Sequence, residues 1–448
     1  MADELLVVIG GREVGHVRRV RNGTLSFAYA DTYPRDGVPL SPNMPIRNQP
    51  YKHNSIDAYL AGLLPDNDAV RARWASKFKV ADEPFLLLSH MGLECAGAVQ
   101  FVDPAQRHLL DGDGRHEPVS RAEIGDRLRE LRTAGEEVGW THPAEHWSLA
   151  GAQAKFTLAL IDGTWHEATG SAATTHIIKP GIRRMKYQAI AEFATMRVAD
   201  RVGLRTARVD IEDFDGEPAL VVKRFDRLER DGQIVRLHQV DLCQAAGYHP
   251  KFKYEAQHGP SGRQLASLIR SASSRPDEDV LAFSDALLFN YLSSSPDGHA
   301  KNMALLLTGT QARFAPLYDL ATGAPYGAAD IAPTAAFSVG GVRNFGEAYP
   351  KNWRAHAAEL GLDRDERTQR AIELAERIPD AFRDVLHNEI EGDAGEILWR
   401  RMTRKSPSGA GRLLEYCSRV TERLASSTKT DSISRATRRA TRTARAVD

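Results

Sequence analysis

Cysteine is scarce in this chain of 448 residues, where it occurs only at Cys95, Cys243 and Cys417. These three positions lie far apart and form no C-x-x-C pair, which argues against a zinc site or a disulfide framework. A reducing cytoplasm is the compartment that best fits such cysteine usage.

Long apolar runs and a net charge are absent as well. No stretch approaches the roughly 18 apolar residues that a membrane-spanning helix needs. The first residues, MADELLVVIGG, are acidic and carry only a five-residue apolar run, unlike a secretory signal. Lysine plus arginine and aspartate plus glutamate each number 59, so net charge indicates neither a nucleic-acid nor a membrane partner. We therefore expect a soluble cytoplasmic protein.

The apolar content, 42% of the residues, is sufficient for buried cores in two or three domains of roughly 100–200 residues each. Residues 5–29 contain apolar runs separated by Gly-Gly and Asn-Gly pairs, which predict a small antiparallel β unit with tight turns. Residues 54–78 favour a helix that is broken at Pro65. Residues 103–120 are rich in Asp, Gly and Pro and indicate a domain boundary.

Strands and one helix alternate in the next part of the chain. The segment KFTLALI, residues 155–161, has the alternation of a half-buried strand, and THIIKP and PALVVKRF are further short strand candidates. Residues 188–202 repeat apolar side chains at helical spacing and end before Gly203.

Beyond about residue 255 the pattern becomes mostly helical, and a helix beginning at Pro276 runs out directly before a polar stretch, SSSPDGHAKN. Such a stretch is either a solvated turn or a catalytic loop. Asn302 follows Asp297 by five residues, the spacing at which protein kinases place a metal-binding asparagine after the aspartate that takes the substrate proton. The usual H-R-D prefix is absent. Lys301 is placed to neutralise a transferring phosphoryl group.

Lys179 closes an apolar strand and must reach either an anion or solvent, because burial of an unpaired ammonium is costly. Glu192, thirteen residues further on in the predicted helix, is a candidate partner. A strand lysine paired with a helix glutamate is how protein kinases hold nucleotide phosphates. The alternative is a surface lysine at a strand end. Asp319, seventeen residues after Asn302, lies where a second metal-binding carboxylate is expected.

Small residues precede the strand expected at 155–161. Ala150, Gly151 and Ala152 would let backbone amides approach a phosphate closely. The segment is not a Walker A loop, and a plain turn with small residues is the alternative that this signal alone favours.

Taken in order, these motifs resemble a known family. The segments SLAGAQAKF, THIIKP, VVKRFDR, DGHAKN and PLYDLATGAPY resemble the HipA-like serine/threonine kinases, the toxins of type II toxin–antitoxin modules. The N-terminal segments GREVGHVRRVRNGTLSFAYADTY, GLLPDN and GLECAGAVQF also look like that family. The resemblance extends to about residue 424.

The resemblance implies an α+β, bilobal protein-kinase-like fold with an additional small N-terminal β-rich subdomain and a mainly helical C-terminal lobe. The expected divisions are an N-terminal subdomain over 1–105, a kinase N-lobe over 120–255, a helical C-lobe over 256–424 and a basic tail over 425–448.

By matching motif positions, the resemblance also implies roles for individual residues. Asp297 would be the catalytic base, assisted by Lys301, while Asn302 and Asp319 would hold Mg²⁺. Ser148 would be the serine on which the enzyme phosphorylates itself as an off-switch, because a phosphate there adds charge where ATP binds. The ATP site would consist of Ala150, Gly151, Ala152, Gln153, Ala154, Lys155, Lys179, Glu192, Lys223, Arg224, Phe225, His299, Ala300, Lys301, Asn302, Tyr318 and Asp319.

The implied cofactors are ATP and Mg²⁺, and the implied substrate is a protein hydroxyl in a translation component such as glutamate–tRNA ligase, an aminoacyl-tRNA ligase. The implied partner is a small helix-turn-helix antitoxin resembling HipB, through which operator DNA would be contacted and the operon co-repressed. Growth inhibition and persistence belong to the same expectation. The alternatives are a corepressor scaffold with little kinase activity and a kinase of a small molecule or lipid.

Three features depart from the family pattern, one of which is the short basic segment GIRRMKYQ after Lys179. Lys223 stands where an acidic hinge residue is expected, although hinge contacts to adenine are largely made by the backbone. The last twenty-four residues hold five arginines and one lysine among small polar residues, and they cannot bury enough surface to order themselves. They are either a solvated tail or a phosphate-binding arm.

Overall fold

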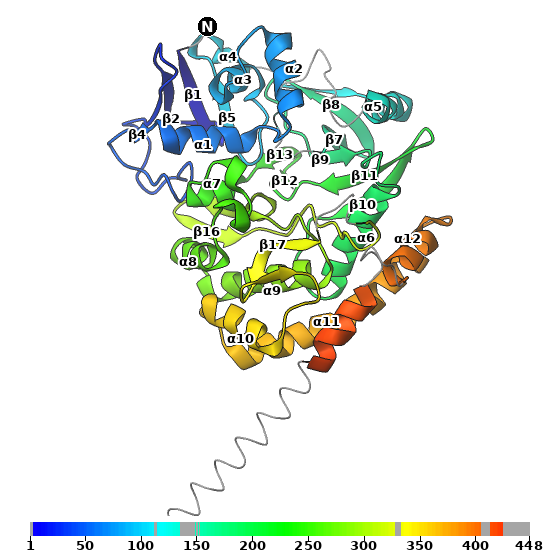
Figure 1. Cartoon of the computed structure of the whole chain (residues 1–448). Helices are drawn as coiled ribbons and strands as arrows, with labels where there is room; N and C mark the ends of the chain where they lie inside the picture. The colour runs from blue at the N-terminus through cyan, green and yellow to red at the C-terminus, as the bar shows by residue number, and fades with distance from the viewer. Residues whose placement is uncertain are drawn as a thin grey trace, which may run out of the picture.

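The structure is a computed structural model in which three parts of the chain pack against one another (Figure 1). The N-terminal subdomain lies beside a strand lobe, and both lie above a helical lobe. The residues that the structure describes are 3–111, 114–134, 148, 151, 153–327, 333–404 and 413–423.

The N-terminal subdomain, residues 3–111, is built on a five-stranded antiparallel sheet of order β4-β3-β2-β1-β5. Gly10 and Gly11, with φ of 58° and 77°, make the tight turn between the first two strands. The predicted β unit over residues 5–29 is confirmed. The strands are β1 (Glu4–Ile9), β2 (Arg12–Arg19), β3 (Leu25–Tyr29), β4 (Tyr51–Lys52) and β5 (Val99–Val102).

Helices pack on this sheet. At a break between the first two helices the chain turns toward the strand lobe and the helical lobe. The predicted interruption at Pro65 is confirmed, because the first helix ends at Leu63 and the second begins at Asp68. Asn67 caps the second helix by accepting hydrogen bonds from the amides of Ala69 and Val70. The helices are α1 (His53–Leu63), α2 (Asp68–Phe78), α3 (Pro84–Met91) and α4 (His108–Asp111).

The strand lobe is a six-stranded antiparallel sheet of order β10-β11-β9-β7-β8-β6, with α5 and α6 packed against it. The three predicted strands and the predicted helix over 188–202 are present. The elements are β6 (Arg115–Pro118), α5 (Arg121–Ala134), β7 (Phe156–Ile161), β8 (Thr164–Thr169), β9 (His176–Lys179), α6 (Gln188–Arg201), β10 (Val209–Phe214) and β11 (Glu217–Lys223).

β7 differs from the half-buried strand that its sequence predicts. Phe156 and Leu158 lie in one buried apolar cluster with Ile124 and Leu128 of α5, as the alternation requires. Thr157, on the other face, is also buried. Alternation alone therefore identified the strand but not the burial of both its faces.

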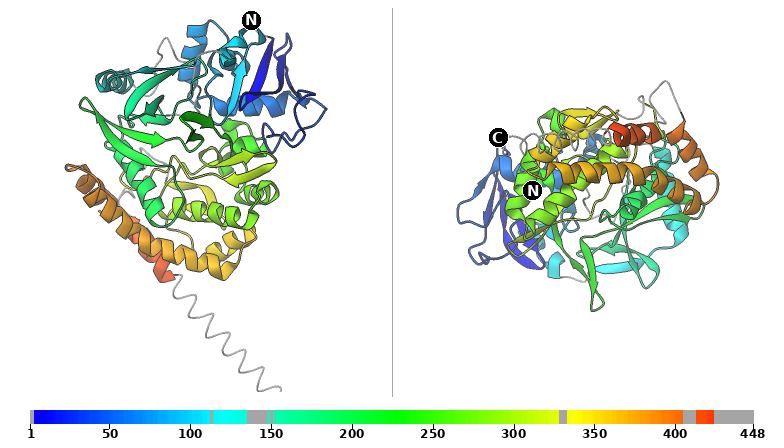
Figure 2. Two further views of the ribbon diagram at one scale, coloured as in Figure 1. Left: turned by 180° about the vertical axis from the view of Figure 1, so that it is seen from behind. Right: turned by 90° about the horizontal axis from the view of Figure 1, so that it is seen from below.

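The helical lobe begins after strand β14 (His238–Asp241) and contains the predicted helix from Pro276, which ends at Leu292. The long helix α11 runs beneath the lobe and contacts α6 and α9 (Figure 2). The helices are α7 (Leu242–Ala246), α8 (Gly262–Ala272), α9 (Pro276–Leu292), α10 (Pro350–Glu359), α11 (Arg364–Asn388) and α12 (Ala394–Thr403).

Short strands supplement these helices at the boundary with the strand lobe. The apolar run after the polar stretch forms β15, which pairs with β14 on one side and β16 on the other. The described architecture confirms an α+β fold with a mainly helical C-terminal part. The strands are β12 (Arg227–Arg230), β13 (Gln233–Arg236), β14 (His238–Asp241), β15 (Ala304–Thr308), β16 (Gln311–Phe314), β17 (Thr334–Val339) and β18 (Val342–Asn344).

Among the described residues, every helix is too short or too polar to cross a lipid bilayer. The exact domain divisions stay a prediction.

Candidate active site

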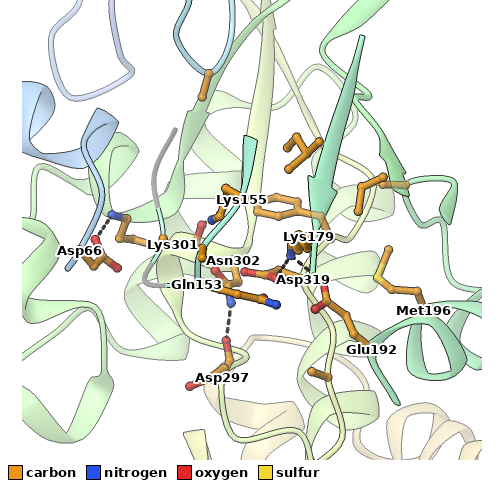
Figure 3. A pocket seen from close by; sticks show the side chains of 18 of the residues that line it. Asp66, Gln153, Lys155, Lys179, Glu192, Met196, Asp297, Lys301, Asn302 and Asp319 are labelled. Atoms are coloured by element: carbon orange, nitrogen blue, oxygen red, sulfur yellow. Dashed lines mark hydrogen bonds and ion pairs between the residues drawn. The ribbon is translucent and has the colours of Figure 1, made fainter. Parts of the chain in front are cut away.

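The polar residues singled out in the sequence gather around one cavity of about 430 Å³, here called the central cavity (Figure 3). All three parts of the molecule contribute to its wall. The polar lining includes Asp66, Gln153, Lys155, Lys179, Glu192, Lys253, Tyr254, Asp297, His299, Lys301, Asn302, Tyr318 and Asp319.

Lys179 lies at the end of β9 between two carboxylates. Its Nζ donates to Oε1 of Glu192 on α6 at 2.6 Å and to Oδ1 of Asp319 at 2.5 Å. The side chains of Lys179 and Glu192 are 7% and 2% exposed. The structure therefore brings together the predicted lysine–glutamate pair and adds Asp319 to it, so the alternative of a surface lysine is wrong.

Lys179 and Asp319 stabilise each other's charge, whereas burial and the nearby Asp319 carboxylate raise the pKa of Glu192. Burial opposes the charge of Lys179, but the carboxylates of Asp319 and Glu192 outweigh it and raise the pKa of the lysine. Burial likewise opposes ionisation of Asp319, whereas the Lys179 ammonium and the nearby Lys155 lower the pKa of its carboxyl group. An ammonium that is firmly charged at neutral pH is suited to bind phosphate.

The polar stretch after α9 forms a loop whose own hydrogen bonds fix its shape. The side-chain amide of Asn302 donates to the backbone carbonyl of Asp297 at 2.8 Å, as does the amide of His299 at 2.8 Å. The hydroxyl of Tyr254 donates to Oδ1 of Asp297 at 2.7 Å. Asp297 is exposed to the central cavity, while Asn302 is 9% exposed. A loop braced in this way holds a carboxylate in place without burying it.

Three further members of this loop are buried. His299 packs edge-on against Tyr254 at 4.9 Å between ring centroids, and burial lowers its pKa to about 3, so its ring is neutral at pH 7. Ala300 is fully buried, and its amide donates to the carbonyl of Lys253 at 3.3 Å. Lys301 turns its ammonium toward Asp66 of the N-terminal subdomain, at 2.5 Å.

The chain before β7 approaches the same cavity. Gly151 has φ of 107°, a conformation that favours glycine, and a Cβ on it would collide with Nζ of Lys155. Burial, with the nearby charge of Lys179, lowers the pKa of Lys155 to about 8. Gln153 and Ala154 also line the cavity. Ala150 and Ala152 lie outside the described residues, so their predicted contacts are not placed.

The predicted hinge follows β11. The amides of Lys223 and Arg224 donate to the carbonyls of Arg208 and Thr175, both at 2.9 Å, so these two amides already have backbone partners. Phe225 faces Tyr318, with ring centroids 5.4 Å apart, and the two rings form an apolar wall of the cavity. An apolar wall of aromatic rings is suited to a purine base.

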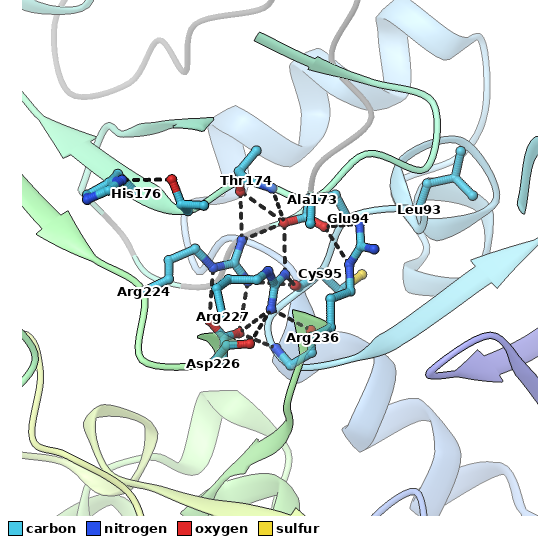
Figure 4. A network of polar contacts seen from close by, with 12 residues as sticks. Leu93, Glu94, Cys95, Ala173, Thr174, His176, Arg224, Asp226, Arg227 and Arg236 are labelled. Carbon is cyan, nitrogen blue, oxygen red and sulfur yellow. Dashed lines mark hydrogen bonds and ion pairs between the residues drawn. The ribbon is translucent and has the colours of Figure 1, made fainter. Parts of the chain in front are cut away.

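The guanidinium of Arg224 belongs to a buried ion-pair network (Figure 4). It donates to Oε1 of Glu94 at 2.8 Å and to Oδ2 of Asp226 at 2.9 Å. Arg227 and Arg236 also pair with Glu94, at 2.8 and 2.6 Å. Burial opposes the charge of Glu94, but the three guanidinium groups hold its pKa well below the ordinary value. The network joins the N-terminal subdomain to the turn after β11 and to the β12–β13 hairpin that follows it.

We expect Glu94→Gln to lower the free energy of unfolding by about 3–5 kcal/mol, because the buried Arg224 and Arg227 would keep only the carboxylate of Asp226, and Arg236 would lose its carboxylate partner. Chemical denaturation followed by circular dichroism measures this change. Because folding lowers the pKa of Glu94, its stabilisation is present above the ordinary glutamate pKa and is lost as the pH falls below it.

Glu83→Gln is the matched control for this experiment. Glu83 pairs with Arg19 at 2.8 Å, but its side chain is 41% exposed. Such pairs contribute about 1 kcal/mol or less. Equal losses of stability in the two variants would contradict a structural role for the network.

Ser148 is anchored to the N-terminal subdomain. It is fully buried, its hydroxyl donates to the carbonyl of Leu63 at 2.9 Å, and its amide donates to the carbonyl of Glu94 at 2.7 Å. The predicted phosphorylation of this residue is not tested by the structure, but in this arrangement the hydroxyl is hidden from solvent.

Asn302 and Asp319 are compatible with the Mg²⁺ ion that a kinase-like site requires. They offer amide and carboxylate oxygens, the ligand types that Mg²⁺ prefers, and this ion is ordinarily held by one or two carboxylates together with substrate phosphates. The side chain of Asp319 is 31% exposed although Lys179 contacts one of its oxygens. These two residues would hold the ion.

Sequence analysis does not identify Asp66, Lys253 or Tyr254 as members of the site. Asp66 lies in the GLLPDN segment directly after the helix-breaking Pro65, and this position at a break is the one local signal for it. The loop that carries Lys253 and Tyr254 offers no comparable motif.

Comparison with solved structures defines the class of fold. A chain of the Shewanella oneidensis MR-1 complex of HipA, HipB and operator DNA superposes with a TM-score of 0.74 at 25% identity, and the match covers 94% of this chain and 96% of that chain. The molecule therefore has the protein-kinase-like fold of HipA, with the central cavity between its two lobes.

Comparison with known sequences defines the family. Residues 5–102 match the HipA N-terminal domain, and residues 147–382 match the HipA-like C-terminal domain. The serine/threonine-protein kinase toxin HipA of Shewanella oneidensis is 31% identical over 399 residues, 83% of this chain and 88% of that protein. A Sinorhizobium fredii protein provisionally named kinase Y4mE is 34% identical over 389 residues, 84% of this chain and 90% of that protein. The chain belongs to the HipA family.

Proposed function

We propose that this protein is an ATP-dependent serine/threonine protein kinase and the toxin of a HipA/HipB-type toxin–antitoxin module. The observation that carries the proposal is the placement of Lys179 between Glu192 and Asp319, on the same cavity as the loop from Asp297 to Asn302. The named kinase relatives support it.

In the proposed reaction Asp297 accepts the proton of the acceptor hydroxyl as its oxygen attacks the γ-phosphorus and ADP leaves. Tyr254 orients the carboxylate by donating to one of its oxygens. Lys179 binds nucleotide phosphates, and Lys301 neutralises the charge of the transferring group. Mg²⁺, when bound by Asn302 and Asp319, supplies further neutralisation of the phosphate charge.

The proposed acceptor is a serine or threonine of a translation component, with glutamate–tRNA ligase as the first candidate. The proposed partner is a small helix-turn-helix antitoxin of the HipB kind, which would carry the protein to operator DNA in the cytoplasm. The solved complex of HipA, HipB and operator DNA supports this partnership.

Transfer of radiolabelled phosphate from ATP in the presence of Mg²⁺ tests the proposal. We expect label on purified glutamate–tRNA ligase and on the protein itself. Label on the protein alone would reject the ligase as acceptor. Label on neither would reject the kinase proposal and favour the corepressor scaffold, and label on a small molecule or lipid extract would change the substrate class.

Phosphorylation of Ser148 is proposed to switch the enzyme off. We expect Ser148→Asp to weaken ATP binding by about tenfold or more, because an acidic group would be placed beside the site of the ATP phosphates. Ser148→Ala, which removes only the hydrogen bond to Leu63, should have a smaller effect. Isothermal titration calorimetry measures both affinities.

Enzyme incubated with ATP and Mg²⁺ should show the same weakening, with phosphate on Ser148 detected by mass spectrometry. Wild-type affinity in Ser148→Asp and in the incubated enzyme would show that Ser148 is not a switch.

A further inference from the structure

A short segment of the N-terminal subdomain reaches the central cavity (Figure 3). It contacts the chain before β7 on one side and Lys253 and Lys301 on the other. Residues 63–66, here called the bridging segment, comprise the last residue of α1 and most of the connection to α2. Pro65 prevents the first helix from continuing, and the chain therefore turns toward the cavity.

The side chain of Asp66 binds two lysines from outside the N-terminal subdomain. Its Oδ1 accepts a hydrogen bond from Lys301 at 2.5 Å, and its Oδ2 accepts one from Lys253 at 2.7 Å. The side chains of Asp66, Lys301 and Lys253 are 15%, 2% and 19% exposed. Two ammonium groups thus share one carboxylate in a place with little water.

The carboxylate is ionised at neutral pH. Burial opposes its charge, but Lys301 and Lys253 outweigh the effect and hold the pKa of Asp66 at about 2. Without this anion two like charges would remain partly desolvated and face each other, so the lysines would separate.

The backbone of the bridging segment contacts the chain that precedes β7. The carbonyl of Leu63 accepts a hydrogen bond from the hydroxyl of Ser148 at 2.9 Å, and the amide of Asp66 donates to the carbonyl of Gly151 at 3.2 Å. Pro65 and Gly151 form a parallel β-bridge. The same few residues therefore hold the strand-lobe side and the helical-lobe side of the cavity.

We propose that Asp66 is a positioning residue for phosphoryl transfer, which aims the ammonium of Lys301 at the reacting phosphate. The inference rests on the proposed kinase function. Lys301 lies four residues after Asp297, so the loop fixes where its side chain begins. Its long stem has many rotamers, and the bond to Asp66 selects one of them. The N-terminal subdomain in this way contributes a positioning residue to the active site.

The test compares Asp66→Asn, which keeps the shape but removes the charge, with Asp68→Asn two residues away. Asp68 carries a side chain that is 89% exposed and pairs with Arg71. Initial rates of phosphate transfer from ATP give kcat and KM. We expect Asp66→Asn to lower kcat by about 10–100-fold, because misplaced catalytic groups cost rates of this order. Its KM for ATP should change only a few-fold, since Lys179 still binds the phosphates. Asp68→Asn should match the wild type in both constants.

Asp66→Glu restores the anion and should recover part of the lost kcat, which a merely structural defect would not. Wild-type kcat in Asp66→Asn, or no recovery in Asp66→Glu, overturns the proposal. If Asp66→Asn does not fold, Asp66→Glu becomes the test. Its longer side chain displaces the carboxylate and should lower kcat more than it raises KM. An unchanged kcat in Asp66→Glu would overturn the proposal. Absence of transfer in the wild type and Asp68→Asn would instead reject the kinase function itself.

Discussion

Asp297→Asn is expected to lower kcat for phosphate transfer by roughly 100-fold or more while leaving the fold intact. The amide cannot accept the proton of the acceptor hydroxyl, and this proton transfer is the step assigned to Asp297. The loop should keep its shape, because Asn302 and His299 bond to the backbone carbonyl of residue 297 and not to its side chain. ATP affinity should therefore change little.

Stopped assays with saturating ATP and Mg²⁺ measure this effect. Asp31→Asn is the matched control, since Asp31 is an exposed aspartate of the N-terminal subdomain and should give wild-type rates. A folded Asp297→Asn enzyme with near-normal turnover would show that another group takes the proton.

Lys179→Met is expected to reduce phosphate transfer by about 100-fold or more, since it removes the buried cation that would bind the phosphates. Methionine is apolar, so the carboxylates of Glu192 and Asp319 would lose the counter-ion that they share. Glu192→Ala should have a smaller effect, because Lys179 keeps its bond to Asp319 at 2.5 Å.

The two variants are compared by ATP affinity and by kcat, with melting temperatures to separate unfolding from loss of function. Lys351→Met, at an exposed position on α10, is the control for removal of a positive charge. Unchanged activity in both Lys179→Met and Glu192→Ala would remove the pair from the mechanism.

Short-range patterns in the sequence predicted the parts of the site that depend on neighbouring residues. The spacing from Asp297 to Asn302 predicted a catalytic loop, a role that stays a prediction, and Lys179 at a strand end was predicted to reach either an anion, with Glu192 as candidate, or solvent. The family and the α+β kinase-like fold were also correct. These features depend on local geometry or on several motifs in a fixed order.

Contacts between distant segments were not predictable in the same way. Asp66 and Lys301 are separated by 235 positions, and Glu94 and Arg224 by 130. No local periodicity in the sequence indicates these contacts, because they form only when the three parts of the molecule have packed together. For this reason the sequence predicted Arg224 beside the nucleotide without indicating its distant partners. In the structure its guanidinium belongs to the ion-pair network around Glu94. Its role in nucleotide binding stays a prediction that concerns its backbone.

The buried network around Glu94 also determines how the molecule comes apart. Glu94 belongs to the N-terminal subdomain, whereas Arg224, Arg227 and Arg236 follow β11. Separation of the N-terminal subdomain from the segment after β11 would leave these three cations with only one carboxylate, that of Asp226. The penalty makes an intermediate with only one part folded unfavourable. The network therefore favours joint unfolding of the N-terminal subdomain and the segment after β11, because unfolding of either part alone loses all the ion pairs of Glu94.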